Sequence, residues 1–268
     1  MKPMNTDRIL YEDNDIIVCH KPAGIATQTA RVGQADMVSE ITNYLAMAGG
    51  SAASHGTENK TGHITGGRPY VGVVHRLDQP VEGVLVFAKN RQTAADLSRQ
   101  TQENRMEKYY YAVVCGRDFK SCGELTDYLF KDGKTNTSRV VPPETKDAKK
   151  AVLDYKVLAE QTCEEIADTA RRIALVEIRL HTGRHHQIRV QMSHAGMGLL
   201  GDYKYADAEV VKVSEQMNIK EIALCAYKLS FLHPGTGKLL QFQIEPEGRS
   251  FQIHDWKKYA EGGSHNEV

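Results

Sequence analysis

The sequence predicts a mixed α+β fold in a single domain. Short runs rich in β-branched and aromatic residues recur along most of the chain, which is typical of strands. Helical segments are fewer: one is predicted near 36–47, and another follows Asn90, a residue suited to cap a helix, and reaches about Glu103. No internal repeat or break in composition divides the 268 residues. We therefore expect one domain over 1–260, followed by a disordered tail at 261–268.

The N-terminal third is expected to start the sheet. Residues 9–11 and 15–20 are short β-branched runs that turn at Lys21-Pro22-Ala23-Gly24. Residues 49–67 are rich in Gly, Ser, Thr, Asn and His, so we expect a surface loop there. Two further strands are predicted at 71–74 and 83–88, with 75–82 between them.

The remaining elements are mostly strands. Strands are predicted at 108–116, 151–158 and 172–180, whereas 131–150 is polar and is expected to be a loop. The alternation in 184–194 fits either a strand end or a helix start. A closing hairpin is predicted from 221–231 and 238–244 around Pro234-Gly235-Thr236-Gly237, and a helix at 251–259.

Composition restricts the class of protein. The chain is 41% hydrophobic and 25% charged, and it has no run of about 20 apolar residues that could span a bilayer. The N-terminus lacks the apolar core of a secretory signal. The five cysteines are scattered and form no C-x-x-C pair, which favours reduced thiols and a cytoplasmic protein. Because Lys plus Arg and Asp plus Glu are balanced at 34 each, binding of a polyanion would need a local basic face.

The segment His75-Arg76-Leu77-Asp78 places an imidazole, a guanidinium and a carboxylate in a turn between two predicted strands. On spacing alone, an Arg–Asp surface ion pair is the simpler interpretation. A kinase catalytic loop does not fit, because its Asp directly follows the Arg.

The sequence around this segment, together with motifs elsewhere in the chain, favours a catalytic role for Asp78. Residues Val74 to Lys89 resemble the H-R-L-D motif and following strand of the RluA-type pseudouridine synthases, with Val81 and Glu82 in place of Thr and Ser. The resemblance covers about residues 8 to 246. Within it, further motifs of that family are matched in order: Lys21-Pro22-Ala23-Gly24, Lys108-Tyr109-Tyr110, Gly183-Arg184-His185-His186-Gln187-Ile188-Arg189, Gly201-Asp202, Tyr205, Leu224-Cys225-Ala226 and His233-Pro234.

The resemblance implies a fold and an activity. The fold is a central, mostly antiparallel mixed sheet flanked by helices and loops, with the active site in a cleft across it. The chain resembles the catalytic domain alone, without the S4-like N-terminal RNA-binding domain of many relatives. The resemblance implies isomerisation of uridine to pseudouridine in structured ribosomal or transfer RNA. We expect the protein to act as a monomer and to need no cofactor or metal. The alternative is an inactive RNA-binding or ribosome-assembly factor.

Three residues carry the catalytic roles that the resemblance implies. Asp78 maps onto the catalytic aspartate, which attacks C1′ or C6 or promotes formation of a glycal. Tyr110 maps onto a tyrosine that stacks on the base and is a possible general base, although Tyr109 or Tyr111 would look equally good without the family motif. Arg189 maps onto the arginine that pairs with the carboxylate and keeps it ionised.

Other residues are assigned to substrate binding. Arg76 either props the gap left by a flipped base or contacts a phosphate, and Leu224 packs against the base. His75, Lys108, Arg184 and Gln187 complete this set. A local basic face is expected from a first group and a weaker second group: Arg76, Lys89, Arg91, Lys108, Arg184 and Arg189, then Lys146, Lys149 and Lys150.

Two further features concern metal binding and charge near the motif. His75, His185 and His186 could suggest a metal-dependent hydrolase, but no carboxylate or Cys spacing supports a metal site, so none is predicted. Glu82 adds a negative charge near a site that would meet phosphates. We expect it to affect substrate fit before chemistry, or else to face a neighbouring Lys or Arg.

Overall fold

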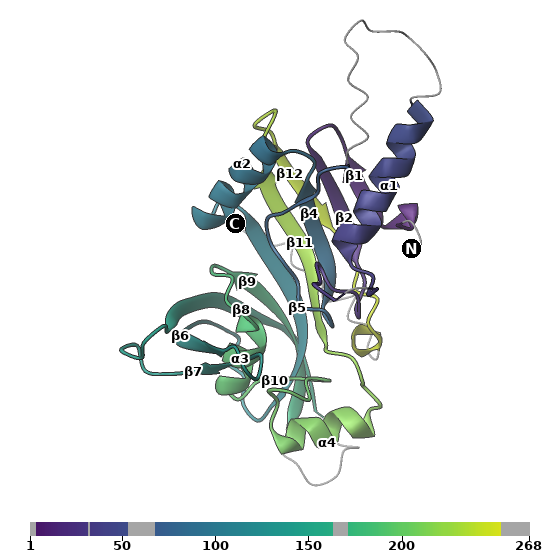
Figure 1. The fold of residues 1–268 in the computed structure, drawn as a ribbon. Coiled ribbons are helices and arrows are strands. Elements are labelled where there is room, and N and C mark those ends of the chain that lie inside the picture. The colour runs from purple at the N-terminus through teal and green to yellow at the C-terminus, as the bar shows by residue number, and fades with distance from the viewer. Residues whose placement is uncertain (1–3, 32, 53–67, 163–170, 253–268) are drawn as a thin grey trace, which may run out of the picture.

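The computed structural model describes residues 4–31, 33–52, 68–162 and 171–252 (Figure 1). Four α-helices lie in these ranges: α1 (Met37–Ala52), α2 (Arg91–Gln102), α3 (Gln187–His194) and α4 (Ala208–Gln216). The strands are β1 (Ile9–Glu12), β2 (Ile16–Lys21), β3 (Gly72–Val73), β4 (Glu82–Ala88), β5 (Glu107–Gly116), β6 (Cys122–Asp132), β7 (Thr137–Val140), β8 (Lys149–Thr162), β9 (Arg172–Leu180), β10 (Gly198–Leu199), β11 (Leu224–Leu232) and β12 (Leu239–Gln243).

All these strands belong to one mixed sheet. Its main path runs β1-β2-β4-β11-β5-β9-β8-β6-β7, while β3 joins β4, β10 joins β5 and β12 joins β11. Among the strand pairs of the described ranges, β4 with β11 is the parallel one, and the others are antiparallel. A parallel pair cannot be joined by a tight turn, so the long chain between β4 and β11 builds the other half of the sheet.

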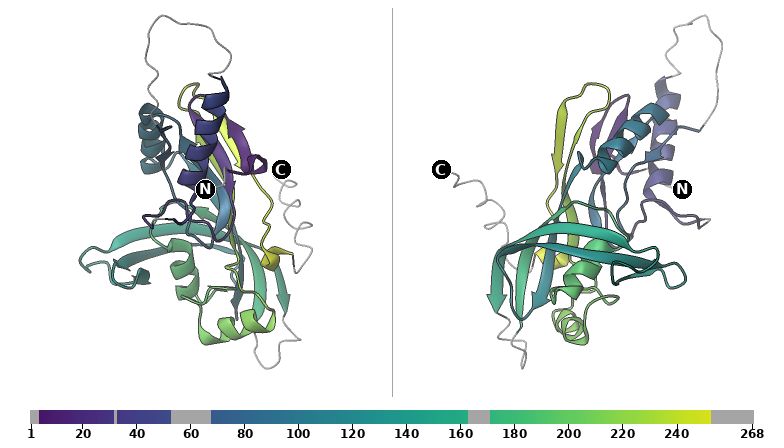
Figure 2. Two further views of the ribbon diagram at one scale, coloured as in Figure 1. Left: turned by 45° about the vertical axis from the view of Figure 1, so that its right-hand side comes forward. Right: turned by 90° about the vertical axis from the view of Figure 1, so that its left-hand side faces the viewer.

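The two ends of the sheet carry different helices. Helices α1 and α2 lie beside the end formed by β1, β2 and β4, whereas α3 and α4 lie at the other end (Figure 1). Strands β6, β7 and β8 curve away from the rest of the sheet and arch beside α3 (Figure 2), which contacts β6, β7 and β10. Long central strands β5 and β11 connect the two ends.

The core explains which strands are central. Every residue of β2 and β4 is buried, because the sheet is covered on both faces there. The largest apolar cluster extends along one face from Ile41 of α1 to Ile188 and Met192 of α3. Strand β6 differs, because exposed and partly buried residues alternate along it, and one of its faces is solvated.

The strands predicted near 9–11, 15–20, 83–88, 108–116, 151–158 and 172–180 are confirmed, as is the hairpin of β11 and β12. The Asn90 cap is also confirmed, since its side chain accepts a hydrogen bond from the Thr93 amide at 2.8 Å. The ambiguous segment 184–194 contains helix α3. The predicted strand 71–74 is reduced to Gly72–Val73.

The expected loops were in part wrong. Helix α1 continues to Ala52, and the polar segment 131–150 contains β7 and the start of β8, while β6 ends at Asp132. Helix α4 and strands β6 and β10 were not predicted. Helix α4 carries a local signal that was missed, because Asp207 caps it and Val210 and Val213 are buried on one face, whereas β10 is only Gly198–Leu199. Residues 53–67, most of the expected 251–259 helix and the 261–268 tail lie outside the described residues.

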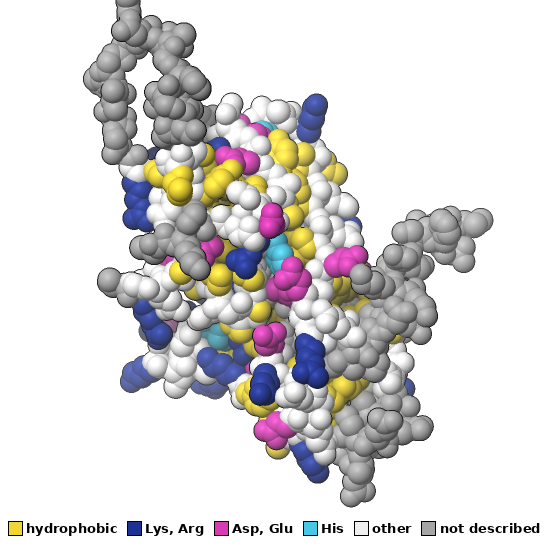
Figure 3. Space-filling view, turned by 90° about the vertical axis from the view of Figure 1, so that its right-hand side faces the viewer, with side chains coloured by type: hydrophobic (Ala, Val, Ile, Leu, Met, Phe, Trp, Pro, Cys, Tyr) yellow, Lys and Arg dark blue, Asp and Glu magenta, His cyan; other side chains and the backbone are white. Residues whose placement is uncertain are grey.

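Charged groups are unevenly distributed on the surface. On the face drawn in Figure 3, Lys and Arg side chains gather in the lower half, the half that carries α4 in Figure 1, with carboxylates among them. None of the described helices is both long and apolar enough to cross a membrane. The four cysteines in the described ranges, Cys19, Cys115, Cys122 and Cys225, form no disulfide.

Candidate active site

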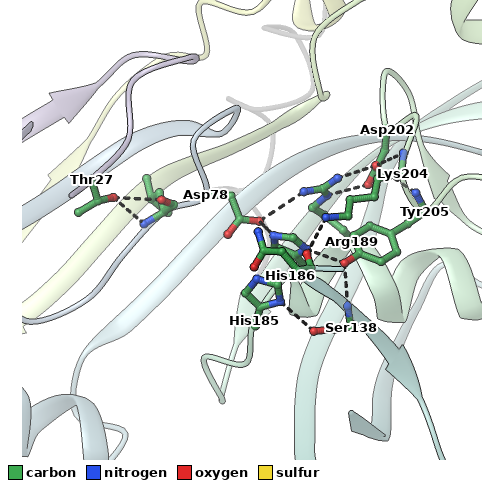
Figure 4. Close-up of polar contacts among 11 residues, drawn as sticks. Thr27, Asp78, Ser138, His185, His186, Arg189, Asp202, Lys204 and Tyr205 are labelled. Atoms are coloured by element: carbon green, nitrogen blue, oxygen red, sulfur yellow. Dashed lines mark hydrogen bonds and ion pairs between the residues drawn. The ribbon is translucent and has the colours of Figure 1, made fainter. Parts of the chain in front are cut away.

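The turn between β3 and β4 fixes the position of Asp78. Thr27 Oγ1 donates to the Leu77 carbonyl at 3.0 Å and accepts from the Leu77 amide at 3.1 Å (Figure 4). The Asp78 carbonyl accepts from the Val81 amide at 3.0 Å. Since Leu77 is buried, the backbone on both sides of Asp78 is held while its side chain remains 29% exposed.

A buried ammonium group ties a second loop to this turn. Lys21 Nζ donates to the carbonyls of Pro22, Ile25 and Gln79 at 3.0, 2.7 and 3.1 Å. Burial lowers the pKa of Lys21 to about 8, so it stays protonated at neutral pH. The Lys21-Pro22-Ala23-Gly24 string therefore supplies an internal cation that joins the two loops, a role the sequence did not reveal.

Arg189 is anchored mainly by Asp202 rather than by Asp78. Its Nε and Nη2 donate to the two Asp202 carboxylate oxygens at 2.8 and 2.7 Å, and Asp202 is 2% exposed. A bidentate pair of this kind fixes the guanidinium plane. The remaining nitrogen, Nη1, lies 3.6 Å from Asp78 Oδ2. Asp202 thus orients the cation that faces Asp78.

His186 is the second group that faces Asp78, with Nε2 3.7 Å from Asp78 Oδ2. It occupies the left-handed region at φ 54° and ψ 28°, directly before α3. Tyr205 Oη lies 2.5 Å from His186 Nδ1 and accepts the Ser138 amide at 2.9 Å. Tyr205 can donate its one hydroxyl proton to Nδ1, and in that arrangement the imidazole proton lies on Nε2, toward Asp78.

The neighbouring His185 supports this arrangement. The two imidazole rings stack with centroids 3.7 Å apart, and Ser138 Oγ lies 2.9 Å from His185 Nδ1. Burial lowers the pKa of each histidine to about 4, so both are neutral near pH 7. The sequence raised His185 and His186 as metal ligands but predicted no metal site, and the Gly183 to Arg189 string was the signal for their place beside Asp78.

The electrostatic balance at Asp78 differs from the expected one. Burial raises the pKa of Asp78, and this effect exceeds the opposing effects of Arg189, His185 and Lys21. Arg189 favours the ionised form, as expected, but without restoring an ordinary pKa. A carboxylate that is poorly solvated in this way interacts more strongly with charge that develops next to it.

An apolar wall completes the site. A cavity of about 90 Å³ is lined by Asp78, Arg189 and His186, and also by Tyr110 of β5 and Leu224 of β11. Tyr110 and Leu224 are 6% and 4% exposed. Burial, and then the charge of Asp78, raise the pKa of Tyr110. Strands far apart in sequence therefore place a phenol and an isobutyl group beside the carboxylate.

The remaining predicted residues lie in three kinds of position. Arg76 is exposed at the cavity and donates to Gln28 Oε1 at 3.1 Å, and Arg184 lines it while donating to the Lys150 carbonyl at 2.9 Å. Gln187 also lines the cavity, but its amide is occupied by Thr182, Gln191 and the Val152 carbonyl.

His75 and Lys108 are not among the residues that line this cavity. His75 Nε2 accepts from the Val86 amide at 3.2 Å, and burial lowers the pKa of His75 to about 3. Burial also lowers the pKa of Lys108. The expected basic face is likewise divided: Arg76, Arg184 and Arg189 meet at the cavity, whereas Lys89 pairs with Glu12 at 2.7 Å.

Glu82 is not among the residues that line the cavity, and among the described residues it forms no ion pair with a Lys or Arg. It is 5% exposed, and its carboxylate accepts the amides of Glu247 and Gly248 at 3.2 and 3.0 Å. Its ion-pair neighbour within the described residues is His20, whose Nε2 lies 3.9 Å from Glu82 Oε2, rather than the expected Lys or Arg. As the first residue of β4, Glu82 instead binds the backbone of the segment that follows β12.

Among the described residues, two groups could offer three metal ligands: Asp13 with Asp15 and His233, and His20 with Glu82 and Glu247. Neither contains a residue of the Asp78 cavity. In the first, Asp13 already binds Tyr11 and His233.

The structure thus brings four residues that the family motifs singled out to one cavity: Asp78, Tyr110, Arg189 and Leu224. The sequence profile of the RNA pseudouridylate synthase family matches residues 15–194, and the chain belongs to this family. It therefore isomerises uridine to pseudouridine in RNA, as its motifs predicted.

Similar proteins support this family membership. An uncharacterized RNA pseudouridine synthase of Aquifex aeolicus is 31% identical over 263 residues, 96% of this chain and 75% of the relative. YlyB of Bacillus subtilis, also an uncharacterized RNA pseudouridine synthase, is 33% identical over 259 residues, 96% and 75% of the two chains. The ribosomal large subunit pseudouridine synthase C of Buchnera aphidicola is 30% identical over 233 residues, 87% of this chain and 65% of that protein.

Human RNA Pseudouridylate Synthase Domain Containing 4 superposes with a TM-score of 0.68 at 22% identity, over 95% of this chain and 94% of that one. This similarity confirms the predicted fold class.

Proposed function

We propose that Asp78 is the catalytic carboxylate and that the uridine it acts on lies in structured ribosomal RNA, with transfer RNA as the other class of target. The observation that carries the proposal is the position of Asp78 Oδ2, 3.6 Å from Arg189 Nη1 and 3.7 Å from His186 Nε2, on the wall of a cavity shared with Tyr110 and Leu224. Relatives named for the large ribosomal subunit favour ribosomal RNA.

The reaction breaks the C1′–N1 bond of uridine, turns the base and forms a C1′–C5 bond. The C5–H bond then breaks and its proton goes to solvent, while N1 takes up a proton. Asp78 can attack C1′ or C6, or stabilise positive charge at the sugar while a glycal forms. Arg189 and His186 hold the carboxylate in place. Tyr110 and Leu224 contact the base while it turns, and the raised pKa of Tyr110 keeps it a neutral phenol. This favours contact with the base over proton abstraction by Tyr110.

A base within folded RNA has to leave its stack to reach a cavity of this kind. Arg76 stands exposed at the cavity and is the group placed to occupy the gap or bind the adjacent phosphate. Arg184 adds a second cation there. The described part of the chain acts as a single catalytic domain, and its thiols fit the reducing cytoplasm.

The direct test is Asp78→Asn assayed by tritium release from RNA that contains 5-tritiated uridine. We expect isomerisation to fall at least about a thousandfold, since Asn has similar volume but can neither attack carbon nor carry charge. RNA affinity should stay within about threefold. Asp118→Asn is the matched control, because the Asp118 side chain is 98% exposed. Activity of Asp78→Asn close to that of the control would overturn the assignment.

The target is tested separately. Pseudouridines in total RNA are mapped in cells with and without this protein. Loss of one or a few sites from the large ribosomal RNA supports the ribosomal target, and loss confined to transfer RNA assigns the other class.

A further inference from the structure

A second, larger cavity adjoins the Asp78 site. Its volume is about 490 Å³, and Arg189 and Asp202 line it together with Pro80, Tyr203, Lys204 and Lys220. Arg189 also lines the Asp78 cavity, so the two cavities lie side by side and share the same guanidinium. No step proposed above for the isomerisation uses the second cavity.

Both walls of the second cavity are held by backbone contacts. On one wall, Gly201 has φ +71°, and a Cβ there would lie 2.0 Å from the Glu221 carbonyl oxygen. The Ala223 amide donates to the Leu200 carbonyl at 2.9 Å, which closes the same pair of loops. On the other wall, the Gly24 amide donates to the Gln79 carbonyl at 2.9 Å, next to the Lys21 bonds. The cavity is therefore formed before any ligand enters.

The side chains of this cavity suit a ligand with a flat face and a negative charge. Tyr203 is 50% exposed, and its hydroxyl donates to the Ile219 carbonyl at 3.1 Å, which holds its ring. Lys204 Nζ donates to the Asn136 carbonyl at 2.6 Å. Lys220 is exposed and makes no hydrogen bond or ion pair with the part of the chain that the structure describes.

The acidic groups do not cancel these cations. Asp202 is committed to Arg189 through both oxygens, and Glu221 is the other carboxylate of the lining. With Arg189 and Asp202 paired to each other, two lysines, Lys204 and Lys220, face one remaining carboxylate, Glu221. A volume of this size also lies within the usual range of about 300–1,000 Å³ for small-molecule sites.

We propose that this cavity binds the nucleotide adjacent to the target uridine, with its base stacked on Tyr203 and its phosphate bound by Lys220. The inference rests on the proposed function, because it requires a flipped uridine at Asp78. Exposed aromatic rings beside cations are the common means of binding unstacked nucleotides, and stacking tolerates different bases. The shared Arg189 places the two sites within the reach of consecutive nucleotides.

The test uses an unmodified transcript of large-subunit ribosomal RNA containing 5-tritiated uridine. Lys220→Ala and Tyr203→Ala are each expected to raise KM about tenfold while kcat changes less than about twofold, because they remove ground-state binding of the RNA. Tyr203→Phe keeps the stacking ring and should remain within about twofold of wild type. Lys212→Ala, an exposed lysine of α4, is the charge-matched control.

A second measurement separates the phosphate contact from a general loss of fit. The slope of log Kd against log salt concentration should fall by about 0.7 in Lys220→Ala, the value for one phosphate contact to a single strand. Tyr203→Ala should leave that slope unchanged.

The outcomes are distinct from those of the active-site proposal. If wild-type protein is active but Lys220→Ala and Tyr203→Ala match Lys212→Ala, the subsite is wrong and the Asp78 assignment stands. A fall in kcat without a rise in KM would also overturn the subsite. If wild-type protein and all variants release no tritium from the ribosomal transcript or from transfer RNA, the proposed function itself has failed.

Discussion

Asp78 is surrounded by groups whose protonation is set by burial. His185 and His186 are neutral because burial lowers the pKa of each to about 4. Tyr205 accepts the Ser138 amide and bonds His186 Nδ1, and donation from Tyr205 to Nδ1 leaves the imidazole proton on Nε2. A neutral imidazole can therefore still present a donor to the carboxylate.

Tyr205→Phe tests this chain of hydrogen bonds. Without the hydroxyl, Nδ1 of His186 loses its donor, so the two tautomers should mix, and nitrogen-15 chemical shifts of the imidazole report the change. We expect kcat to fall about five- to tenfold, since one hydrogen bond to a buried polar group is worth about 1 kcal/mol. Tyr44→Phe, which removes a hydroxyl bound to Glu12 on distant α1, should leave both quantities unchanged. An unaltered nitrogen spectrum in Tyr205→Phe would show that Tyr205 does not fix the tautomer.

The pH dependence follows from the same environment. The ionised form of Asp78 is the active one, and its pKa is raised by burial, so activity is lost as the pH falls through a value above the usual 3.9 of an aspartate. The histidines add no change near pH 6.5, because their pKa values are lowered to about 4. Above about pH 7.5 single-turnover rates should fall as Lys21, whose pKa is lowered to about 8, loses its proton. Between pH 6.5 and 7.5 they should be flat within about twofold. A steep rise across that window would contradict the neutral histidines.

Among the elements, β4 positions both a catalytic candidate, Asp78, and a structural carboxylate, Glu82, at its N-terminal end. The turn before β4 carries Asp78 toward the cavity, while Glu82, its first residue, points to the segment after β12 and accepts the Glu247 and Gly248 amides. The departure from the family motif at this position therefore concerns how that segment is held.

Glu82→Ser, which restores the family residue, should lower the free energy of unfolding by about 1–3 kcal/mol, because two amides lose a charged acceptor. Urea denaturation measures this, and kcat and KM for RNA should each change less than about twofold. Glu124→Ser on exposed β6 is the control and should be nearly neutral. Unchanged stability together with a higher KM would instead support a role for Glu82 in substrate fit.

At the scale of the whole molecule, the parallel pairing of β4 with β11 assembles the site. It aligns Cys225 with Glu82 and Ala226 with Gly83, and thereby brings Leu224 to the turn that carries Asp78. The approach is close: a Cβ on Gly83, at φ +148°, would lie 2.4 Å from the Ala226 Cβ. Glycine at 83 is thus required by the contact between segments more than 140 residues apart.

Gly83→Ala should cost about 3 kcal/mol or more, from backbone strain and overpacking, and should reduce activity along with stability. Thermal unfolding followed by circular dichroism measures the loss. Gly133→Ala is the matched control, because a Cβ there meets nothing within 4 Å. Equal melting temperatures for the two variants would mean that β4 and β11 can separate at little cost.

The sequence alone determined most of the strands and the family. Period-2 runs, the Asn90 cap and the Pro-Gly turn are local signals, and the ordered motifs identified Asp78, Tyr110, Arg189 and Leu224 as candidates. It missed α4 although Asp207 caps that helix and Val210 and Val213 are buried. It also missed the hairpin of β6 and β7, because that hairpin is largely polar and exposed on one face.

Only the tertiary structure decided what surrounds Asp78. Asp202 is the main partner of Arg189, and His186 lies beside the Asp78 carboxylate. Glu82 and His75 do not line the cavity. Motifs record which residue types are present, but burial and hydrogen-bond direction depend on how non-adjacent strands pack. Those two quantities set the pKa values and the positions of the groups that carry out the chemistry.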